Sequence, residues 1–186
     1  MIPGVLTSRP RSTVPLPFTV VIDTREQRPF SIPGAITAKL DQGDYSILGF
    51  ESRIAIERKS LGDLFGTVGG GRKRFEAELQ RLAKLERADI VIEYDFGAMF
   101  NDPPKHSKEM SAQSVAASLI AWSIRYGVYV WFGTDRENAR SITLHILDKF
   151  WKESTQSAPA RVAPEKLLPG QPAGVGTSTQ VTTRRR

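Results

Sequence analysis

The sequence predicts an α/β domain built as three layers, with a mixed sheet flanked by helices. Its second half alternates short apolar strands with amphipathic helices, which indicates parallel strand–helix–strand units with right-handed crossovers. Four short strands come before the first long helix and are close enough in sequence to form a meander. The 186 residues, 40% of them hydrophobic, suffice for one domain with tails.

The strands of the first third are predicted from apolar runs and turns. Residues 18–23 read FTVVID, a continuous run typical of a buried strand. Short strands are expected at 36–40 and 45–48, with a turn at Gly43 between them. Residues 53–58 alternate in polarity and contain β-branched side chains, which predicts a fourth strand.

Glycine and serine residues mark where several of the remaining elements begin and end. Ser60 is a plausible N-cap for a short helix, and the glycines at 69–71 separate it from a helix at 72–87. We then expect, in order, a strand at 89–94, a loop at 96–110, a helix at 111–126, a strand at 128–132 and a helix at 135–152.

The two ends of the chain differ from its middle. Residues 1–17 and 155–186 are rich in Pro, Ser, Thr and Gly, so we expect both to be disordered and 18–154 to form the folded domain. The whole net charge of +6 comes from these ends, and the central segment is formally neutral. The basic isoelectric point is therefore a weak indication that the folded part binds nucleic acid.

Composition excludes several kinds of site. Cysteine is absent, which rules out disulfides and thiolate metal sites and weakly favours an intracellular location: cytoplasm or nucleoid in a prokaryote or virus, nucleus in a eukaryote. Neither His106 nor His145 is expected to bind a metal. No apolar run approaches the ~20 residues of a membrane span, and the first 17 residues lack a secretory signal.

An apolar strand that ends in three charges carries the chemistry. Glu57 and Lys59 should share a face, because alternate side chains of a strand point the same way. Asp44 supplies a second carboxylate from a neighbouring strand. Mg²⁺ prefers one or two carboxylates plus waters, so Asp44 and Glu57 suit a Mg²⁺ or Mn²⁺ site, with Lys59 orienting water or offsetting phosphate charge. The alternative to a metal site is that Glu57, Arg58 and Lys59 are simply the alternating charges of an exposed strand.

These residues resemble the nuclease signature of XPF-type structure-specific endonucleases, of the restriction-endonuclease-like, PD-(D/E)xK class. The match covers about residues 18–152, and its Glu-Arg-Lys-x-x-x-Asp element is highly specific. It comprises Gly43-Asp44, IERKSLGD at 56–63, VIDTRE at 21–26, the basic helix start at 71–75 and DIVIEYD at 89–95. The resemblance implies a restriction-endonuclease-like fold and metal and water chemistry at Asp23, Asp44, Glu57 and Lys59.

The resemblance also gives supporting roles to Arg25, Arg58 and Asp63. We expect Arg58 to pair with a carboxylate and fix the strand end, and Arg25 to do the same or to reach a phosphate. Asp63 is either a site residue or a helix-end charge in an ion pair. For Asp23, a direct place in the metal site is favoured over a supporting one.

Three cations, Arg72, Lys73 and Arg74, open the helix at 72–87. Cations at a helix N-terminus oppose its dipole, so we expect them to contact DNA phosphates; a solvated basic turn is the alternative. Most relatives continue into a tandem helix-hairpin-helix module, and the polar residues after 154 are too few to supply one. DNA gripping is therefore expected from the Arg-rich tails or a partner protein.

The first functional hypothesis is a Mg²⁺- or Mn²⁺-dependent DNA endonuclease that cuts duplexes at branches, flaps or junctions in repair or recombination. The alternatives are a non-catalytic DNA-binding or scaffold module of the same fold, and an RNase or sequence-specific nuclease of a mobile element. The expected partner is branched duplex DNA, with no membrane. A homodimer is suggested by Phe150 and Trp151, which could extend an apolar face of the last helix.

Overall fold

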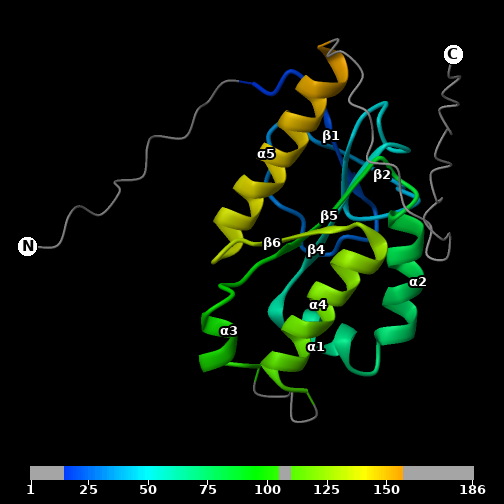
Figure 1. The fold of residues 1–186 in the computed structure, drawn as a ribbon. Coiled ribbons are helices and arrows are strands. Elements are labelled where there is room, and N and C mark those ends of the chain that lie inside the picture. The colour runs from blue at the N-terminus through cyan, green and yellow to red at the C-terminus, as the bar shows by residue number, and fades with distance from the viewer. Residues whose placement is uncertain (1–14, 105–109, 157–186) are drawn as a thin grey trace, which may run out of the picture. The chain divides into compact units, whose positions relative to one another are not determined.

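The computed structural model describes residues 15–104 and 110–156, which are built around one sheet (Figure 1). In chain order the elements are β1 (Val20–Asp23), β2 (Ile36–Ala38), β3 (Tyr45–Ile47), β4 (Ile54–Lys59), α1 (Leu61–Val68), α2 (Arg72–Leu82), β5 (Arg87–Ile92), α3 (Ala98–Asn101), α4 (Ala112–Tyr126), β6 (Tyr129–Phe132) and α5 (Arg136–Thr155). The expected tails lie almost entirely outside the described residues, as does His106. None of the described helices is long and apolar enough to cross a lipid bilayer.

The sheet is mixed, as predicted, with strand order β2-β1-β3-β4-β5-β6. Its second half is parallel, from β4 through β5 to β6, while β3 runs antiparallel to both β1 and β4. The expected meander is wrong, because β1 lies between β2 and β3 and is parallel to β2. Residues 24–35 are long enough to return the chain to the other end of the sheet, as a parallel pairing requires.

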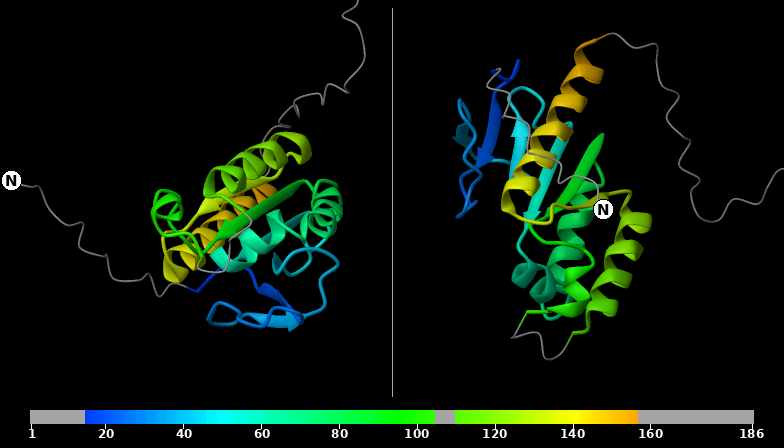
Figure 2. Two further views of the ribbon diagram at one scale, coloured as in Figure 1. Left: turned by 90° about the horizontal axis from the view of Figure 1, so that it is seen from below. Right: turned by 90° about the vertical axis from the view of Figure 1, so that its left-hand side faces the viewer.

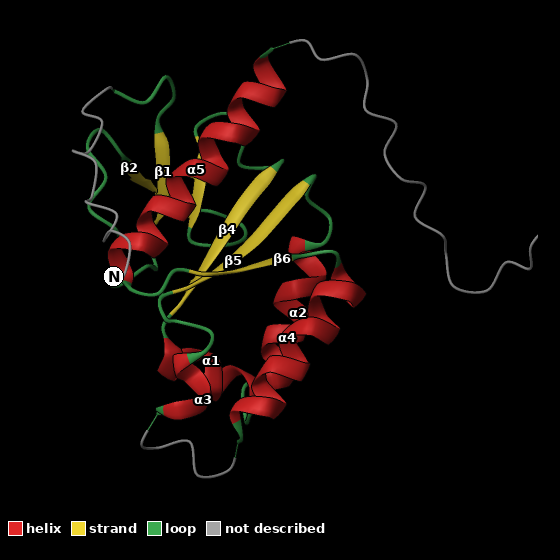
Figure 3. Ribbon diagram, turned by 60° about the vertical axis from the view of Figure 1, so that its left-hand side comes forward, coloured by secondary structure: helices red, strands yellow, loops and turns green. Residues whose placement is uncertain are grey.

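Helices cover both faces of this sheet, which confirms the three layers. On one face, α1, α2 and α4 bury a cluster that includes Leu64, Phe75 and Trp122. On the other face, α5 packs against β3, β4 and β5 and contributes Ala139 and Leu147 to a second cluster. The separation of α5 from the group of α1, α2 and α4 is visible in Figures 2 and 3.

Element ends differ from the sequence expectation where turns intervene. Helix α2 ends at Leu82 instead of residue 87, because residues 83–86 form turns and Arg87 already begins β5. The expected loop at 96–110 contains the single turn of α3.

The aromatic residues at the end of α5 make contacts within the domain. The ring of Phe150 meets that of Phe50 at 6.2 Å between centroids, and Trp151 meets Phe18 at 5.9 Å. These contacts hold α5 against the loops at one end of the sheet. They remove the basis on which the sequence suggested a dimer through α5.

Candidate active site

A glycine turn sets the first carboxylate of the site beside β4. Gly43 has a φ of +70°, and a Cβ added there would lie 3.0 Å from the Cβ of Ala55 and 3.1 Å from the carbonyl oxygen of Ile56. Only glycine therefore allows this close approach. The N–H of Asp44 donates to the Ile56 oxygen at 2.8 Å, which aligns Asp44 with the end of β4.

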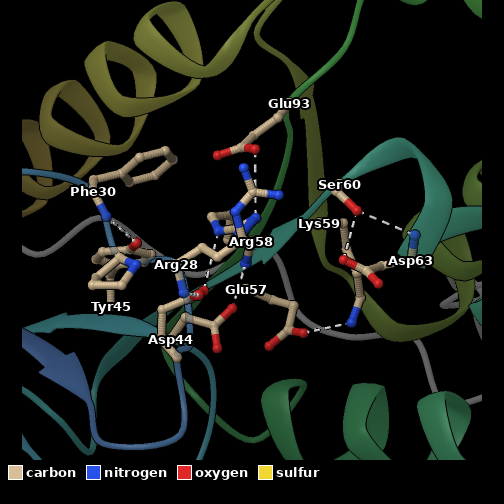
Figure 4. Close-up of polar contacts among 12 residues, drawn as sticks. Arg28, Phe30, Asp44, Tyr45, Glu57, Arg58, Lys59, Ser60, Asp63 and Glu93 are labelled. Carbon is tan, nitrogen blue, oxygen red and sulfur yellow. Dashed lines mark hydrogen bonds and ion pairs between the residues drawn. The ribbon is translucent and has the colours of Figure 1, made fainter.

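Asp44 and Glu57 form a carboxylate pair at this position (Figure 4). One oxygen of Asp44 accepts the backbone N–H of Arg58 at 2.7 Å, and Glu57 is 6% exposed. Burial raises the pKa of Asp44 to about 6. Burial and then the charge of Asp44 raise the pKa of Glu57 to about 8. Two acids this close disfavour double ionisation, and a bound divalent cation would relieve that repulsion.

Lys59 lies on the same face of β4 as Glu57, as predicted. Its ammonium donates to Glu57 Oε1 at 2.6 Å and lies 4.5 Å from the ring centroid of Phe75 on α2. Burial opposes its charged form, but the charge of Glu57 and the hydrogen bond to it outweigh burial and raise the pKa of Lys59. Lys59 is therefore a cation held beside the carboxylate pair.

Arg58 points to the opposite face of β4 and pairs with carboxylates, as expected. Its guanidinium lies 3.1 Å from Glu26 and 3.5 Å from Glu93, and its side chain is 6% exposed. Glu93 in turn binds Arg136, the first residue of α5. This network joins the end of β4 to the end of β5 and to α5, and it fixes the backbone that carries Glu57 and Lys59.

Asp23 and Arg25 hold each other at the end of β1. The oxygens of Asp23 accept hydrogen bonds from the N–H and guanidinium of Arg25, at 2.8, 2.6 and 3.2 Å, and from Leu40 N–H at 2.6 Å. Burial alone would raise the pKa of Asp23, but these hydrogen bonds lower it. We expected Asp23 among the metal ligands; instead, four hydrogen bonds occupy its carboxylate, and it positions Arg25, whose side chain is 64% exposed.

Asp63 lies in the first turn of α1 and bonds to Ser60, the N-cap of that helix. Its N–H donates to Ser60 Oγ at 3.2 Å, and the Ser60 hydroxyl donates to the Asp63 carboxylate at 2.6 Å. The negative charge also lies at the favourable end of the helix dipole. Of the two expectations for Asp63, this arrangement matches a charge at a helix end. Its partner is the hydroxyl of Ser60 in a capping hydrogen bond, where an ion pair was expected.

The three cations expected to contact DNA, Arg72, Lys73 and Arg74, differ in their surroundings. Arg72 donates to Glu76 at 3.2 Å and to Ser118 on α4 at 2.6 Å, and it lies over the ring of Trp122. It therefore joins α2 to α4. Lys73 and Arg74 are exposed at the start of α2.

The residues of this site fit a small divalent cation. Asp44 and Glu57 provide the one or two carboxylates that Mg²⁺ prefers, and the remaining positions suit water and phosphate oxygens. Within residues 15–104 and 110–156 no group of three or more acidic or histidine side chains is placed to hold a metal. The pair is therefore the candidate metal site.

Sequence comparison identifies the family of this chain. A family model described as the ERCC4 domain matches residues 22–145. The chain is 29% identical over 118 residues to the DNA repair endonuclease XPF of Cricetulus griseus, covering 58% of this chain and 12% of that protein. It is 31% identical over 116 residues to the 3'-flap repair endonuclease Xpf of Saccharolobus solfataricus, covering 62% of this chain and 45% of that protein. The chain thus matches less than half the length of both curated relatives.

Solved structures agree with the fold. XPF from Aeropyrum pernix matches with a TM-score of 0.57 at 21% identity, over 83% of this chain and 70% of that one. The same protein in complex with DNA matches with a TM-score of 0.55 at 21% identity, over 76% and 68%. These likenesses concern the fold alone, and they confirm the restriction-endonuclease-like architecture that the sequence resemblance implied.

Proposed function

Because the chain belongs to the ERCC4 domain family of XPF-type nuclease domains, we propose that it is a metal-dependent DNA endonuclease that cuts duplexes at branches, flaps or junctions. The observation that carries the proposal is the pair of half-buried Asp44 and buried Glu57, with Lys59 bound to Glu57 at 2.6 Å. A site with no catalytic role would have little reason to withdraw two neighbouring acids from water, one partly and one almost fully, since each costs desolvation energy.

The proposed mechanism assigns separate tasks to the side chains of the site. Asp44 and Glu57 would hold Mg²⁺ or Mn²⁺, which supplies charge relief at the phosphate and an activated water when bound. Lys59 keeps its positive charge near the reacting phosphate, where it offsets charge that develops in the transition state. Its contact with the Phe75 ring gives the ammonium a second favourable partner besides Glu57.

The proposed DNA contacts come from the end of β1 and the start of α2. Arg25 is anchored through Asp23 yet exposed, which suits a guanidinium that binds a phosphate. Lys73 and Arg74 present two further cations at the start of α2. Such contacts position a duplex without reading its sequence, which is the kind of binding that a nuclease of branched DNA needs.

We also propose that the protein acts inside cells as a homodimer, through a surface other than α5. Beside the edge strand β6, helix α4 exposes Ile120 (60%) and Ile124 (80%). A groove of about 350 Å³ lies there, lined by these two residues, by Phe96, and by Val130 and Phe132 of β6. These groove-lining side chains carry no charge, so the same surface on a second copy is complementary to it across a two-fold axis.

A panel of flap, fork, Holliday-junction, linear duplex and RNA substrates tests the nuclease function. Pure protein with Mg²⁺ or Mn²⁺ is expected to nick the branched DNA substrates, and Asp44→Ala protein of unchanged thermal stability is expected to leave them intact. Cleavage by Asp44→Ala at the wild-type rate would contradict the proposed metal site. Cleavage of RNA alone would contradict the proposed substrate.

A further inference from the structure

Helix α2 carries two glutamates that flank its buried stripe on opposite sides. Phe75, Leu79 and Leu82 form the stripe and are 3% exposed or less. Successive residues of a helix are about 100° apart, so Glu76 lies on one flank of Phe75, while Glu78, three residues after Phe75, lies on the other. The two carboxylates therefore face different surroundings.

The flank of Glu76 is the one that meets α4. Its carboxylate accepts a hydrogen bond from Trp122 Nε1 at 3.0 Å and from Arg72 at 3.2 Å. Glu78 consequently faces away from α4. Phe75 itself touches the ammonium of Lys59 at the end of β4, so the free flank of α2 lies beside the carboxylate pair.

The electrostatics of the site agree with this placement. The carboxylate of Glu78 is close enough to interact electrostatically with Asp44, Glu57 and Lys59. It also acts on Arg25, at the other edge of the site. Within the part of the chain that the structure describes, the side chain of Glu78 makes no hydrogen bond or ion pair. It is a half-buried carboxylate that faces the catalytic groups without a direct partner.

We propose that Glu78 is a positioning residue of the metal site, which accepts hydrogen bonds from water on a cation held by Asp44 and Glu57. This inference rests on the proposed nuclease function. Mg²⁺ keeps several of its waters when proteins bind it, and those waters need acceptors. A direct bond is not assigned, because the described residues form no three-carboxylate cluster.

Metal affinity tests this role apart from activity. Mn²⁺ binding to the full chain is measured by isothermal titration calorimetry for the wild type, Glu78→Gln and the matched control Glu76→Gln. Loss of an outer-shell partner typically weakens metal binding by about 10-fold or more, so Glu78→Gln is expected to do so. Glu76→Gln is expected to bind Mn²⁺ as the wild type does. Thermal unfolding of each protein checks that the fold is kept.

A fourth protein, Asp44→Asn, separates the inference from the proposed function. If Asp44→Asn loses Mn²⁺ binding while Glu78→Gln keeps the wild-type affinity, the role of Glu78 is wrong and the metal site stands. If Asp44→Asn binds Mn²⁺ as tightly as the wild type, the metal site itself is wrong. Equal weakening by Glu76→Gln and Glu78→Gln would also overturn the inference, since it would reflect only the charge of the helix.

Discussion

The ammonium of Lys59 is held between a carboxylate and an aromatic ring. It lies 2.6 Å from Glu57 Oε1 on its own strand and 4.5 Å from the ring centroid of Phe75 on α2. The first contact follows from strand alternation, and the second from the packing of α2 against the sheet. Together they fix a positive charge at the place where a phosphate would approach the carboxylate pair.

Replacing Lys59 with alanine is expected to abolish most cleavage without unfolding the protein. Removal of one preorganised group that stabilises transition-state charge costs on the order of 100- to 1,000-fold in rate. Single-turnover cleavage of a flap substrate at saturating Mg²⁺ measures the effect. Lys152→Ala serves as a control, because this lysine pairs with Asp148 on the surface of α5. A Lys59→Ala rate within a few-fold of the wild type would contradict the role.

Stability without metal is expected to fall as pH rises toward 8. The folded pKa values of Asp44 and Glu57 are about 6 and about 8, whereas unfolded acids titrate near about 4. Between these pKa values the folded state therefore binds more protons than the unfolded state. The stability that Asp44 and Glu57 contribute in this way is complete below about pH 4, and it is lost as pH rises through about 6 and about 8.

Differential scanning fluorimetry from pH 5 to 8.5 measures this dependence. Mg²⁺ should raise the melting temperature more at pH 8 than at pH 5.5, because the cation binds the ionised pair. Asp44→Asn provides the control and should flatten the pH dependence. If the metal-free wild type instead becomes more stable across this range, in parallel with Asp44→Asn, the raised pKa values of Asp44 and Glu57 would be contradicted.

The sequence was sufficient for the parts of the site that depend on local geometry. Strand alternation placed Glu57 and Lys59 together, and the buried charge of Arg58 required a carboxylate. It was insufficient for Glu93, which pairs with Arg58 from 35 residues away, and for Arg136, which pairs with Glu93 from 43 residues away along the chain. Periodicity likewise identifies a strand without its neighbour, so the parallel pairing of β2 with β1 was missed.

Breaking the network around Arg58 is expected to destabilise the protein strongly. Glu93→Ala leaves two guanidiniums, of Arg58 and Arg136, short of a partner. Loss of one member of a buried ion pair typically costs about 3–5 kcal/mol, and chemical denaturation measures it. The exposed Arg53–Glu86 pair is the comparison, with side chains 40% and 56% exposed. Glu86→Ala should cost about 1 kcal/mol or less, and equal effects of the two variants would contradict the distinction.

The cations at the start of α2 are expected to differ in what they do. Lys73→Ala/Arg74→Ala should weaken binding to all duplexes alike and reduce the slope of log affinity against log salt by about 2, if each contacts one phosphate. Fluorescence anisotropy at several salt concentrations measures both. Arg72→Ala should instead lower thermal stability, because this residue joins α2 to Ser118 on α4. An unchanged salt slope in the double variant would exclude the proposed contact.

The apolar surface of α4 and β6 is expected to mediate self-association. Ile124→Glu would bury two charges at the centre of a symmetric interface, so light scattering across a concentration series should change from dimer to monomer. Because the side chain is 80% exposed, the fold should keep its melting temperature. Ile36→Glu, at a 40% exposed position on the opposite edge strand, is the control and should remain dimeric. A wild type that is monomeric at high concentration would exclude the dimer, and a dimer retained by Ile124→Glu would place its interface elsewhere.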